Sequence, residues 1–356
     1  MTTIRSLIRV YLCSSAVPFL LILASVCQAG KQDGRLDIYW VDAEGGAATL
    51  VVTPAGESVL IDTGNPGRRD ADRITQVATR LAGLKKIDHV VITHYHGDHF
   101  GGASFLAENI PLGTLWDNGE FEGQPNFPSK DYKNLKADKK VVINPGDVLP
   151  LKQNGKATEL AFTCLGTRKT FIEAAADAEE NAAICGTARP KERDGSDNAN
   201  SVVMLLEFGP FRFFDGGDLT WNQEAKLACP KNIVGQVDVY QVTHHGLESS
   251  NNPLVLKSLQ PKVAIMNNGH KKGCGPEVFA NLQETDSLEA IYQVHKNLRP
   301  DGKVNNTAAE LIANHEPAEK CRGHHIHLSV APDGKSYTVN IPAHKHTREF
   351  KTRLSE

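Results

Sequence analysis

Apolar residues recur along the first part of the chain in short runs separated by turn-forming residues, and this spacing predicts strands. One segment differs: residues 69–82 place apolar side chains every three or four positions, which is the spacing of a helix that buries one face. A group of histidines follows directly after the last apolar run of this part of the chain. The predicted strands cover residues 36–41, 47–53, 58–62 and 88–93.

The second part of the chain predicts more strands than helices. Residues 117–140 are polar and indicate a long loop, and the alanine- and glutamate-rich residues 171–183 predict a short surface helix. Polar residues recur where the strands end, which favours two sheets packed face to face, with helices outside and a site along one rim. The further predicted strands cover residues 141–144, 158–164, 201–208, 211–215, 237–246 and 261–270, followed by a hairpin over 324–330 and 336–341.

The N-terminal residues have the pattern of a secretory signal peptide over residues 1–29. Arg5 and Arg9 give a positive start, an apolar run covers 16–26, and small residues follow. An uncleaved membrane anchor is the alternative, but the run is shorter than the ~20 residues that span a bilayer. A lipoprotein cut before Cys27 is disfavoured because Val26 is bulky. We therefore expect a secreted or periplasmic protein.

The rest of the chain shows no clean boundary between domains. We expect one domain over residues 33–342, with an elaborated C-terminal part from about residue 296. The last residues, 343–356, are basic and polar, and they predict a mobile tail.

Composition narrows the class of partner. The 356 residues carry a formal net charge of −3, and 40% hydrophobic with 23% charged residues is ordinary for a globular protein. This charge balance does not indicate nucleic-acid binding, although it is compatible with it. No segment after the N-terminal apolar run predicts a membrane channel. A small-molecule or nucleotide substrate is the expectation. The lysine-rich residues 130–140 predict either a solvated loop or a basic lip for a phosphate group.

Five cysteines remain if Cys13 and Cys27 leave with the signal peptide. Export would permit disulfides, and proximity along the chain predicts the pairs Cys164–Cys185 and Cys274–Cys321, with Cys229 unpaired. No Cys-x-x-Cys pair occurs, so a cysteine-rich zinc site is not expected.

The sequence THYHGDHFGG, residues 93–102, carries the strongest chemical signal. His94, His96, Asp98 and His99 lie within six positions at the end of a predicted strand. Neutral imidazole and carboxylate are ligands that suit zinc, and one sharp loop can serve two adjacent metals. Two metals close together can hold a hydroxide nucleophile and stabilise a leaving oxygen.

This motif resembles the signature of the metallo-β-lactamase superfamily, and other stretches match it in order. VLIDTG carries Asp62, GGDLT carries Asp218, and VTHHG carries His245. Within the superfamily the chain is most similar to the soluble domain of the ComEC-type competence proteins, where Asn198 and Ser201 match an Asn-x-x-Ser strand. The resemblance implies an α/β fold, a four-layer αββα sandwich of two mixed β-sheets flanked by helices.

The resemblance also implies two metal ions, most simply zinc with manganese as an alternative. Asp98, His99 and His245 would hold one ion, His94 and His96 the other, and Asp218 would bridge them. The superfamily usually places another histidine ligand before the bridging aspartate, but none lies between His99 and His244. The residues that could orient or replace a ligand are Asp62, Asp197, Asn198 and Asn200.

Several histidines have alternative interpretations. His244 or His270 could protonate a leaving group beside Asp98, although His270 is displaced from the family pattern and could equally be a loop residue in solvent. His325 and His327 would share one face of a strand, which favours packing over a second metal site.

Three functions are compatible with these residues. The favoured one is a metal-dependent hydrolase that uses a metal-bound hydroxide on a phosphodiester. The same site could hydrolyse a lactone, a β-lactam or another acyl compound, because one fold hosts many chemistries. The third is a non-catalytic secreted binding module with a degenerate metal site, which the missing histidine would favour.

Overall fold

The computed structural model describes residues 33–353 except 156, 157, 177 and 179. The predicted signal peptide, residues 1–29, lies outside the described residues. In the described part of the chain, no helix combines the length and the apolar character that a bilayer crossing requires.

The first sheet has nine strands in the order β17-β16-β15-β1-β2-β3-β4-β5-β6. It is mixed, because β3 to β6 are parallel to one another while the remaining neighbours are antiparallel. Its strands are β1 Leu36–Trp40, β2 Thr49–Val52, β3 Ser58–Ile61, β4 Ile87–Val91, β5 Leu112–Asp117, β6 Lys139–Val142, β15 Ile326–Val330, β16 Ser336–Ile341 and β17 His346–Lys351.

The second sheet has eight strands in the order β14-β13-β12-β11-β10-β9-β7-β8. It is also mixed: β10 to β14 are parallel, and β7, β8 and β9 join antiparallel. Its strands are β7 Leu160–Thr167, β8 Thr170–Phe171, β9 Val203–Phe208, β10 Phe211–Asp215, β11 Val239–Gln241, β12 Val263–Met266, β13 Ala290–His295 and β14 Ile312–Asn314.

The helices are short, and the predicted helix 69–82 is present as α1 followed by one π-helical turn. The α-helices are α1 Arg68–Gln76, α2 Gly97–Phe100, α3 Ala103–Asn109, α4 Lys130–Lys133, α5 Ala182–Cys185, α6 Trp221–Ala228, α7 Pro253–Leu259 and α8 Pro276–Gln283. The π-turn is η1 Val77–Leu81, and the 3₁₀ turns are η2 Asp197–Asn200, η3 Thr243–Gly246, η4 Pro300–Lys303, η5 Ala309–Leu311, η6 Ala318–Lys320 and η7 Pro342–His344.

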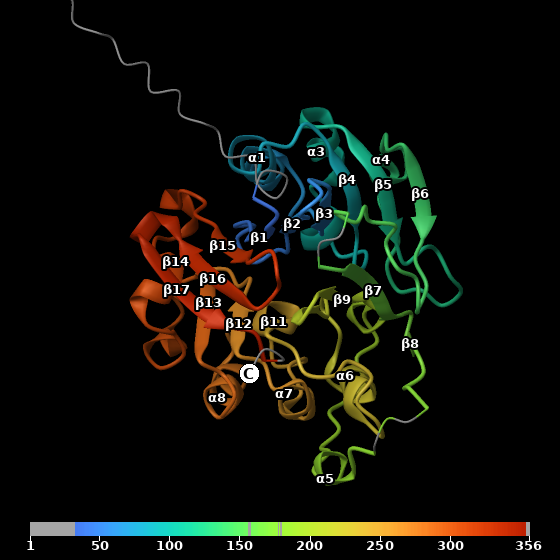
Figure 1. Cartoon of the computed structure of the whole chain (residues 1–356), viewed down its shortest axis with the longest axis vertical. Helices are drawn as coiled ribbons and strands as arrows, with labels where there is room; N and C mark the ends of the chain where they lie inside the picture. The colour runs from blue at the N-terminus through green and yellow to red at the C-terminus, as the bar shows by residue number, and fades with distance from the viewer. Residues whose placement is uncertain (1–32, 156–157, 177, 179, 354–356) are drawn as a thin grey trace, which may run out of the picture.

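Three buried apolar clusters separate four layers. The central cluster lies between the two sheets and includes Trp40 of β1 and Phe213 of β10. A second cluster packs the first sheet against α1 and α3, and a third packs the second sheet against α6, α7 and α8. Figure 1 shows these two groups of helices on opposite outer sides of the sheet pair. The predicted αββα sandwich is therefore confirmed.

One predicted helix is wrong. The described residues between 172 and 181 contain no helix, and only the four-residue α5 follows them. Alanine and glutamate favour a helix intrinsically, but a short segment needs an apolar face to pack, and none of the residues of α5 is buried. Strands β13 and β14 are present but were not among the predicted strands.

The predicted mobile tail also needs correction. Within residues 343–356, the strand β17 runs to Lys351 and pairs with β16 over six positions. Phe350 lies in the central core, which gives this polar segment an apolar anchor. The hairpin of β15 and β16 that precedes it is confirmed.

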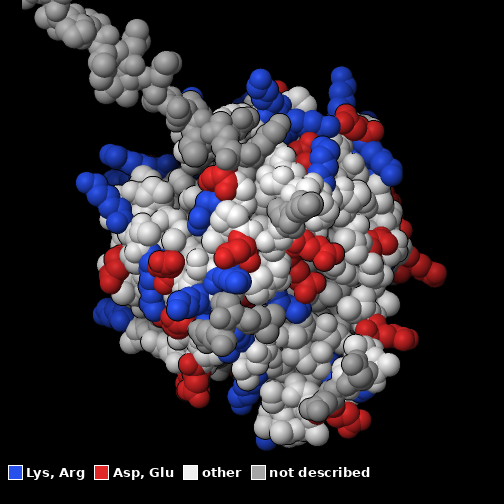
Figure 2. All heavy atoms as spheres, in the orientation of Figure 1, with Lys and Arg blue, Asp and Glu red and all other residues white. Residues whose placement is uncertain are grey.

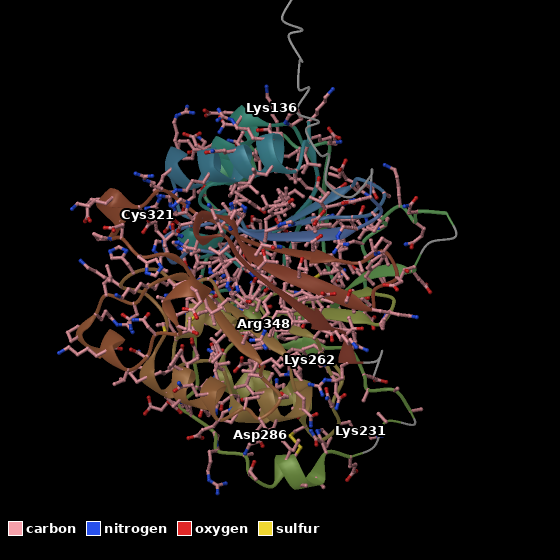
Figure 3. The ribbon with its side chains drawn as sticks, turned by 60° about the vertical axis from the view of Figure 1, so that its left-hand side comes forward. Lys136, Lys231, Lys262, Asp286, Cys321 and Arg348 are labelled. Carbon is pink, nitrogen blue, oxygen red and sulfur yellow. A yellow bond between two sulfur atoms is a disulfide. The ribbon has the colours of Figure 1, made fainter. Side chains whose placement is uncertain are left out.

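Both predicted disulfide pairs are wrong. Cys185 at the end of α5 is bonded to Cys229, which directly follows α6, with 5.7 Å between the Cα atoms. Figure 3 shows this bond near Lys231. Cys164 is buried in the central core, and Cys274 and Cys321 are free thiols. The bonded pair is separated by 44 residues, so its partners are neighbours in space and not along the chain.

Loss of this disulfide should destabilise the fold. Replacing both partners, Cys185→Ser with Cys229→Ser, releases a loop in the unfolded chain and should lower the free energy of unfolding by about 2–4 kcal/mol. Urea unfolding of the variant and of the oxidised parent measures the difference. Peptide mapping without reduction should recover the Cys185–Cys229 pair; recovery of a Cys164–Cys185 peptide instead would contradict the structure.

A buried acid connects α6 to the start of α7. Glu224 is 1% exposed and accepts a hydrogen bond from the backbone N–H of Asn252 at 2.8 Å, while its second carboxyl oxygen has no partner among the described residues. Burial raises the pKa of Glu224 to about 7. The native state therefore keeps a proton that the unfolded chain loses near pH 4.5.

This shift makes stability depend on pH. As the pH rises from 4.5 to 7, Glu224 ionises in the unfolded chain but stays protonated in the native state, so the free energy of unfolding should fall by about 3 kcal/mol. Glu224→Gln keeps the acceptor oxygen and removes the titration. The free energy of unfolding of this variant, relative to that of the parent, should therefore grow between pH 5 and pH 8. Urea unfolding at both values tests this, with the exposed Glu284→Gln as control; parallel profiles for Glu224→Gln and the parent would contradict it.

Candidate metal centre

The predicted ligands come together where strands of both sheets end. Asp62 follows β3, and the loop from His94 to His99 follows the parallel neighbour β4. Asp218 and His245 follow the parallel strands β10 and β11 of the other sheet. Because parallel strands present their carboxyl ends at the same rim, segments that are far apart in the sequence meet there.

The two glycines after the histidine loop are required by close packing. A side chain at Gly101 would lie 2.1 Å from the carbonyl oxygen of Gly97, and one at Gly102 would lie 2.1 Å from that of Thr63. Any larger residue would therefore displace the turn that carries His99.

Four residues form the first ligand set: Asp98, His99, Asp218 and His245 each offer one atom within 4.8 Å of all the others. His99 Nε2 lies 3.1 Å from Asp218 Oδ2 and 3.4 Å from Asp98 Oδ2. His245 Nε2 lies 3.5 Å and 3.3 Å from the same two oxygens. Two imidazoles thus face two carboxylates across one small space.

The second ligand set consists of His94, His96 and Asp218. His94 Nε2 lies 3.9 Å from Asp218 Oδ2, the same oxygen that faces the first set. Asp218 therefore stands between the two sets, in the position predicted for a bridging carboxylate. His94 is fully buried, whereas His96 is partly exposed and borders the open side of the site.

The residues fit a pair of metal ions. His94 Nε2 is buried and has no hydrogen-bond partner among the described residues. His99 Nε2 and His245 Nε2 point at one another across 3.3 Å. A buried nitrogen lone pair without a donor is costly, and a bound cation would satisfy these nitrogens and the carboxylates together.

The carboxylates dominate the electrostatics of the site. Burial alone would lower the pKa of His99, but Asp218, Asp62 and Asp98 raise it well above its usual value. Burial would raise the pKa of Asp218, but the neighbouring imidazoles hold it well below its usual range. The site thus concentrates negative charge that attracts a cation.

Asp62 orients this centre without facing the shared space. Its Oδ2 accepts hydrogen bonds from His99 Nδ1 at 2.7 Å and from the Thr93 hydroxyl at 2.8 Å, and its Oδ1 accepts from the Thr93 backbone N–H at 2.8 Å. The His99 proton is therefore fixed on Nδ1, which turns Nε2 toward the metal space. Asp62 adopts a φ of 61°, a left-handed conformation that is strained for aspartate.

Of the three residues considered as a replacement ligand, two are engaged elsewhere. Asp197 accepts hydrogen bonds from the Tyr95 backbone N–H at 2.9 Å and from the Asn200 side chain at 3.0 Å. Asp197, supported by Asn200, therefore holds the histidine loop in place. Asn198 differs: its amide nitrogen lies 3.2 Å from His244 Nε2, and its buried amide oxygen has no partner among the described residues.

His244 lies beside the ligand sets, 3.4 Å from Asp218 Oδ2. An amide nitrogen can only donate, so the Asn198 contact makes His244 Nε2 an acceptor and leaves the proton on Nδ1, beside Ser249 and Ser250. Burial lowers the pKa of His244 to about 4. These contacts favour a neutral, hydrogen-bonding imidazole over a proton donor.

The remaining histidines lie outside the centre. His270 Nδ1 is 3.3 Å from Glu44, and its ring faces His295, so the structure does not bring it to either ligand set. His327 stacks on Tyr39 and contacts Asp37, which confirms packing as the role of that strand.

Lys272 is a site residue that the sequence did not reveal. Its Nζ contacts Asp98 Oδ2, and its side chain is 38% exposed at the edge of the centre. A lysine on a loop carries no spacing signal, so only the fold could place it there.

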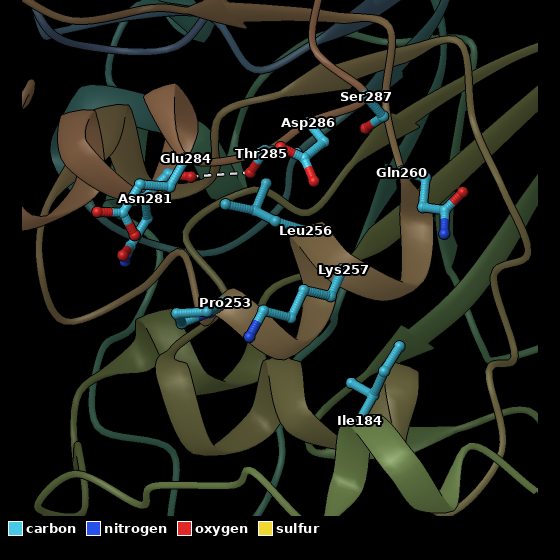
Figure 4. A pocket seen from close by; sticks show the side chains of 10 residues that line it. All are labelled: Ile184, Pro253, Leu256, Lys257, Gln260, Asn281, Glu284, Thr285, Asp286 and Ser287. Carbon is cyan, nitrogen blue, oxygen red and sulfur yellow. Dashed lines mark hydrogen bonds between the residues drawn. The ribbon is translucent and has the colours of Figure 1, made fainter.

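A separate cavity of 730 Å³ lies between α5, α7 and α8, and none of the ligand residues lines it. Figure 4 shows its lining, with Lys257 and Asp286 on facing sides.

Comparison with known proteins agrees with this geometry. Residues 41–166 match the profile of the metallo-beta-lactamase superfamily. The chain is 35% identical over 91 residues to a UPF0173 metal-dependent hydrolase of Cupriavidus metallidurans, covering 24% of this chain and 27% of the relative.

Two longer alignments cover most of the chain. ComE operon protein 3 of Bacillus subtilis is 27% identical over 261 residues, covering 67% of this chain and 29% of the relative. Recombination protein 2 of Haemophilus influenzae is 24% identical over 279 residues, covering 78% of this chain and 29% of the relative. The chain thus spans less than a third of the length of these relatives.

The orientation of His99 by Asp62 can be tested by metal affinity. Asp62→Asn keeps the size of the side chain but weakens its hold on the His99 proton, so metal affinity should fall roughly 10- to 100-fold. Competition with a chromogenic chelator measures the affinity. Asp72→Asn, an exposed position on α1, is the control, and an unchanged affinity in Asp62→Asn would contradict the role assigned to Asp62.

Proposed function

We propose that the chain is a metal-dependent hydrolase of the metallo-β-lactamase superfamily, which holds two zinc ions and cleaves a phosphodiester. The observation that carries the proposal is the position of Asp218 Oδ2 between two ligand sets. A shared carboxylate oxygen is the arrangement that a dinuclear hydrolase requires. Manganese would accept the same nitrogen and oxygen ligands.

Each residue of the centre has a distinct task in this proposal. Bound metal ions would supply a hydroxide at neutral pH and stabilise charge on the leaving oxygen. One ion would be held by Asp98, His99 and His245, and the other by His94 and His96. Asp218 would bind both ions. The neutral His244 and Asn198 form a polar wall beside Asp218, in which the second amide N–H of Asn198 can donate to a substrate oxygen.

Lys272 favours an anionic substrate. Its ammonium group lies at the edge of the centre, where it can approach a phosphate oxygen once a cation neutralises Asp98. Positive and negative side chains are interspersed over the face shown in Figure 2, so that face offers no continuous basic track for a long nucleic acid. Because the whole chain also carries a formal net charge of −3, we propose a nucleotide-sized phosphodiester over a polymer.

The relatives add a second line of support for this bond type. One of them is named for recombination, and recombination acts on DNA, which is a phosphodiester polymer. Lactones, β-lactams and other acyl compounds remain chemically compatible with the same centre. An acyl compound without an anionic group gives no role to the Lys272 cation, because a neutral group does not attract it. A non-catalytic binding module would not require a carboxylate placed between two ligand sets.

We also propose that the protein works outside the cytoplasm. The Cys185–Cys229 disulfide supports this, since structural disulfides persist mainly in oxidising compartments. The charge and apolar pattern of residues 1–29 is the other support.

Hydrolysis of a chromogenic phosphodiester by the zinc-loaded protein tests the proposed activity. Asp98→Ala removes a ligand of the first set, so kcat/KM should fall by more than about 100-fold, beyond what loss of an outer hydrogen bond costs. Lys272→Ala should raise KM for the phosphodiester but leave a neutral chromogenic ester unaffected.

The neighbouring Lys271→Ala is the matched control, because Lys271 is exposed and makes no side-chain contact with the centre among the described residues. Turnover of the neutral ester with no turnover of the phosphodiester would replace the proposal by an acyl hydrolase. A protein that binds two metals and turns over neither substrate would favour the binding module.

A further inference from the structure

A second cluster of metal-ligating residues lies apart from the two ligand sets. Asp42 and Glu44 come from the loop after β1, His295 ends β13, and Cys321 follows η6. Each offers one ligand atom, and these four atoms all lie within 4.8 Å of one another. None of the four belongs to the centre described above.

The cluster is compact, and three of its four side chains are buried. His295 Nε2 lies 2.5 Å from Asp42 Oδ1 and 3.7 Å from Glu44 Oε2, and Cys321 Sγ lies 3.1 Å from Asp42 Oδ2. The side chains of Asp42 and His295 are fully buried, and that of Glu44 is 3% exposed. Glu44 Oε2 points into this space without a hydrogen-bond partner among the described residues.

An ion pair with Arg73 is the alternative explanation of the cluster. Arg73 binds Asp42 Oδ2 at 2.8 Å and Glu44 Oε1 at 3.4 Å. It leaves Asp42 Oδ1 to His295. It also leaves Glu44 Oε2 between His270 Nδ1 at 3.3 Å and His295 Nε2 at 3.7 Å without a hydrogen bond, so it does not complete the network. Burial alone would raise the pKa of Asp42, but His295 and Arg73 lower it to about 2, so this carboxylate is ionised. Arg73 can thus act as the outer partner that orients two ligating carboxylates.

A surface cavity leads to Cys321. It measures 550 Å³, and Cys321 lines it together with His315, His324 and His344. The rings of His315 and His324 lie 5.0 Å and 6.4 Å from that of His344. Burial lowers the pKa of His315 and of His324, which keeps both imidazoles neutral and able to bind a cation. Figure 3 shows Cys321 at the edge of the molecule.

We propose that Asp42, Glu44, His295 and Cys321 form a structural site for a zinc ion, which enters through the histidine-lined cavity. One sulfur, one nitrogen and two carboxylate oxygens are a complete tetrahedral zinc set. Binding converts the Cys321 thiol to a thiolate and releases one proton to solvent. The dication and Arg73 then match the three negative charges of the cluster.

The site would stabilise the loop that supports the catalytic centre. The loop after β1 continues from Glu44 to Ala47, whose backbone N–H donates to the carbonyl oxygen of Asp98 at 3.0 Å. The bound ion would therefore connect Cys321, in the C-terminal part of the chain, to the segment against which Asp98 packs.

Cobalt(II) titration of the full chain tests the proposal independently of activity. Cobalt occupies zinc sites, and a thiolate ligand adds a charge-transfer absorption in the near ultraviolet that nitrogen and oxygen ligands do not. The centre with Asp218 contains no cysteine, so this absorption reports on Cys321. We expect it in the parent and in Asp218→Asn, and we expect its loss in Cys321→Ser.

Cys274→Ser is the matched control, because Cys274 is a buried free thiol outside the cluster and its loss should leave the absorption unchanged. Cobalt binding without the absorption in the parent would overturn the proposal. So would an absorption that persists in Cys321→Ser.

Alkylation of the parent protein gives a second readout that needs no variant. Among the free thiols that the structure describes, Cys321 is partly exposed, whereas Cys164 and Cys274 are buried. Zinc should slow the reaction of Cys321 with iodoacetamide at least 10-fold, as followed by peptide mass. An equal rate with and without zinc would show that the cluster is an ion-pair network only.

Discussion

The metal centre depends on the hydrogen bonds of one buried carboxylate. Asp62 binds Thr93 through the backbone N–H and the hydroxyl, and it binds His99 through Nδ1. Thr93 begins the ligand loop and His99 lies in α2 near its other end, so the side chain of Asp62 fixes both ends of the loop. The left-handed conformation of Asp62 costs about 1–3 kcal/mol, and hydrogen bonds to an ionised acceptor are strong enough to offset it.

The sequence was most informative where the chemistry is local. Four ligands lie within six positions, and the strand before them has an unmistakable apolar run, so both the motif and its place at a strand end could be predicted. Asp218 and His245 were assigned because their short motifs, GGDLT and VTHHG, resemble those of the metallo-β-lactamase superfamily. The layered fold followed from the same alternation, since each sheet buries apolar residues against its own helices.

Features that depend on distant partners could not be predicted in this way. The disulfide joins α5 to the end of α6, and distance along the chain says nothing about that contact. The polar tail becomes a strand because β16 offers it an unpaired edge and Phe350 reaches the core. Asp197 has the chemistry of a ligand but accepts a backbone hydrogen bond instead. The cluster of Asp42, His295 and Cys321 has no local pattern at all, because three remote segments supply it.

The order of the first sheet has a consequence for how the polypeptide acquires its structure. β1 is an interior strand whose neighbours are β2 and β15, and Leu36 pairs with Val330 almost three hundred residues later. Such long-range pairing slows folding, and until β15 arrives β1 presents an open edge that other chains can join. A ribosome or a translocation channel must therefore release nearly the whole polypeptide before this sheet can close. A product truncated before residue 326 would keep that edge open and be prone to aggregation.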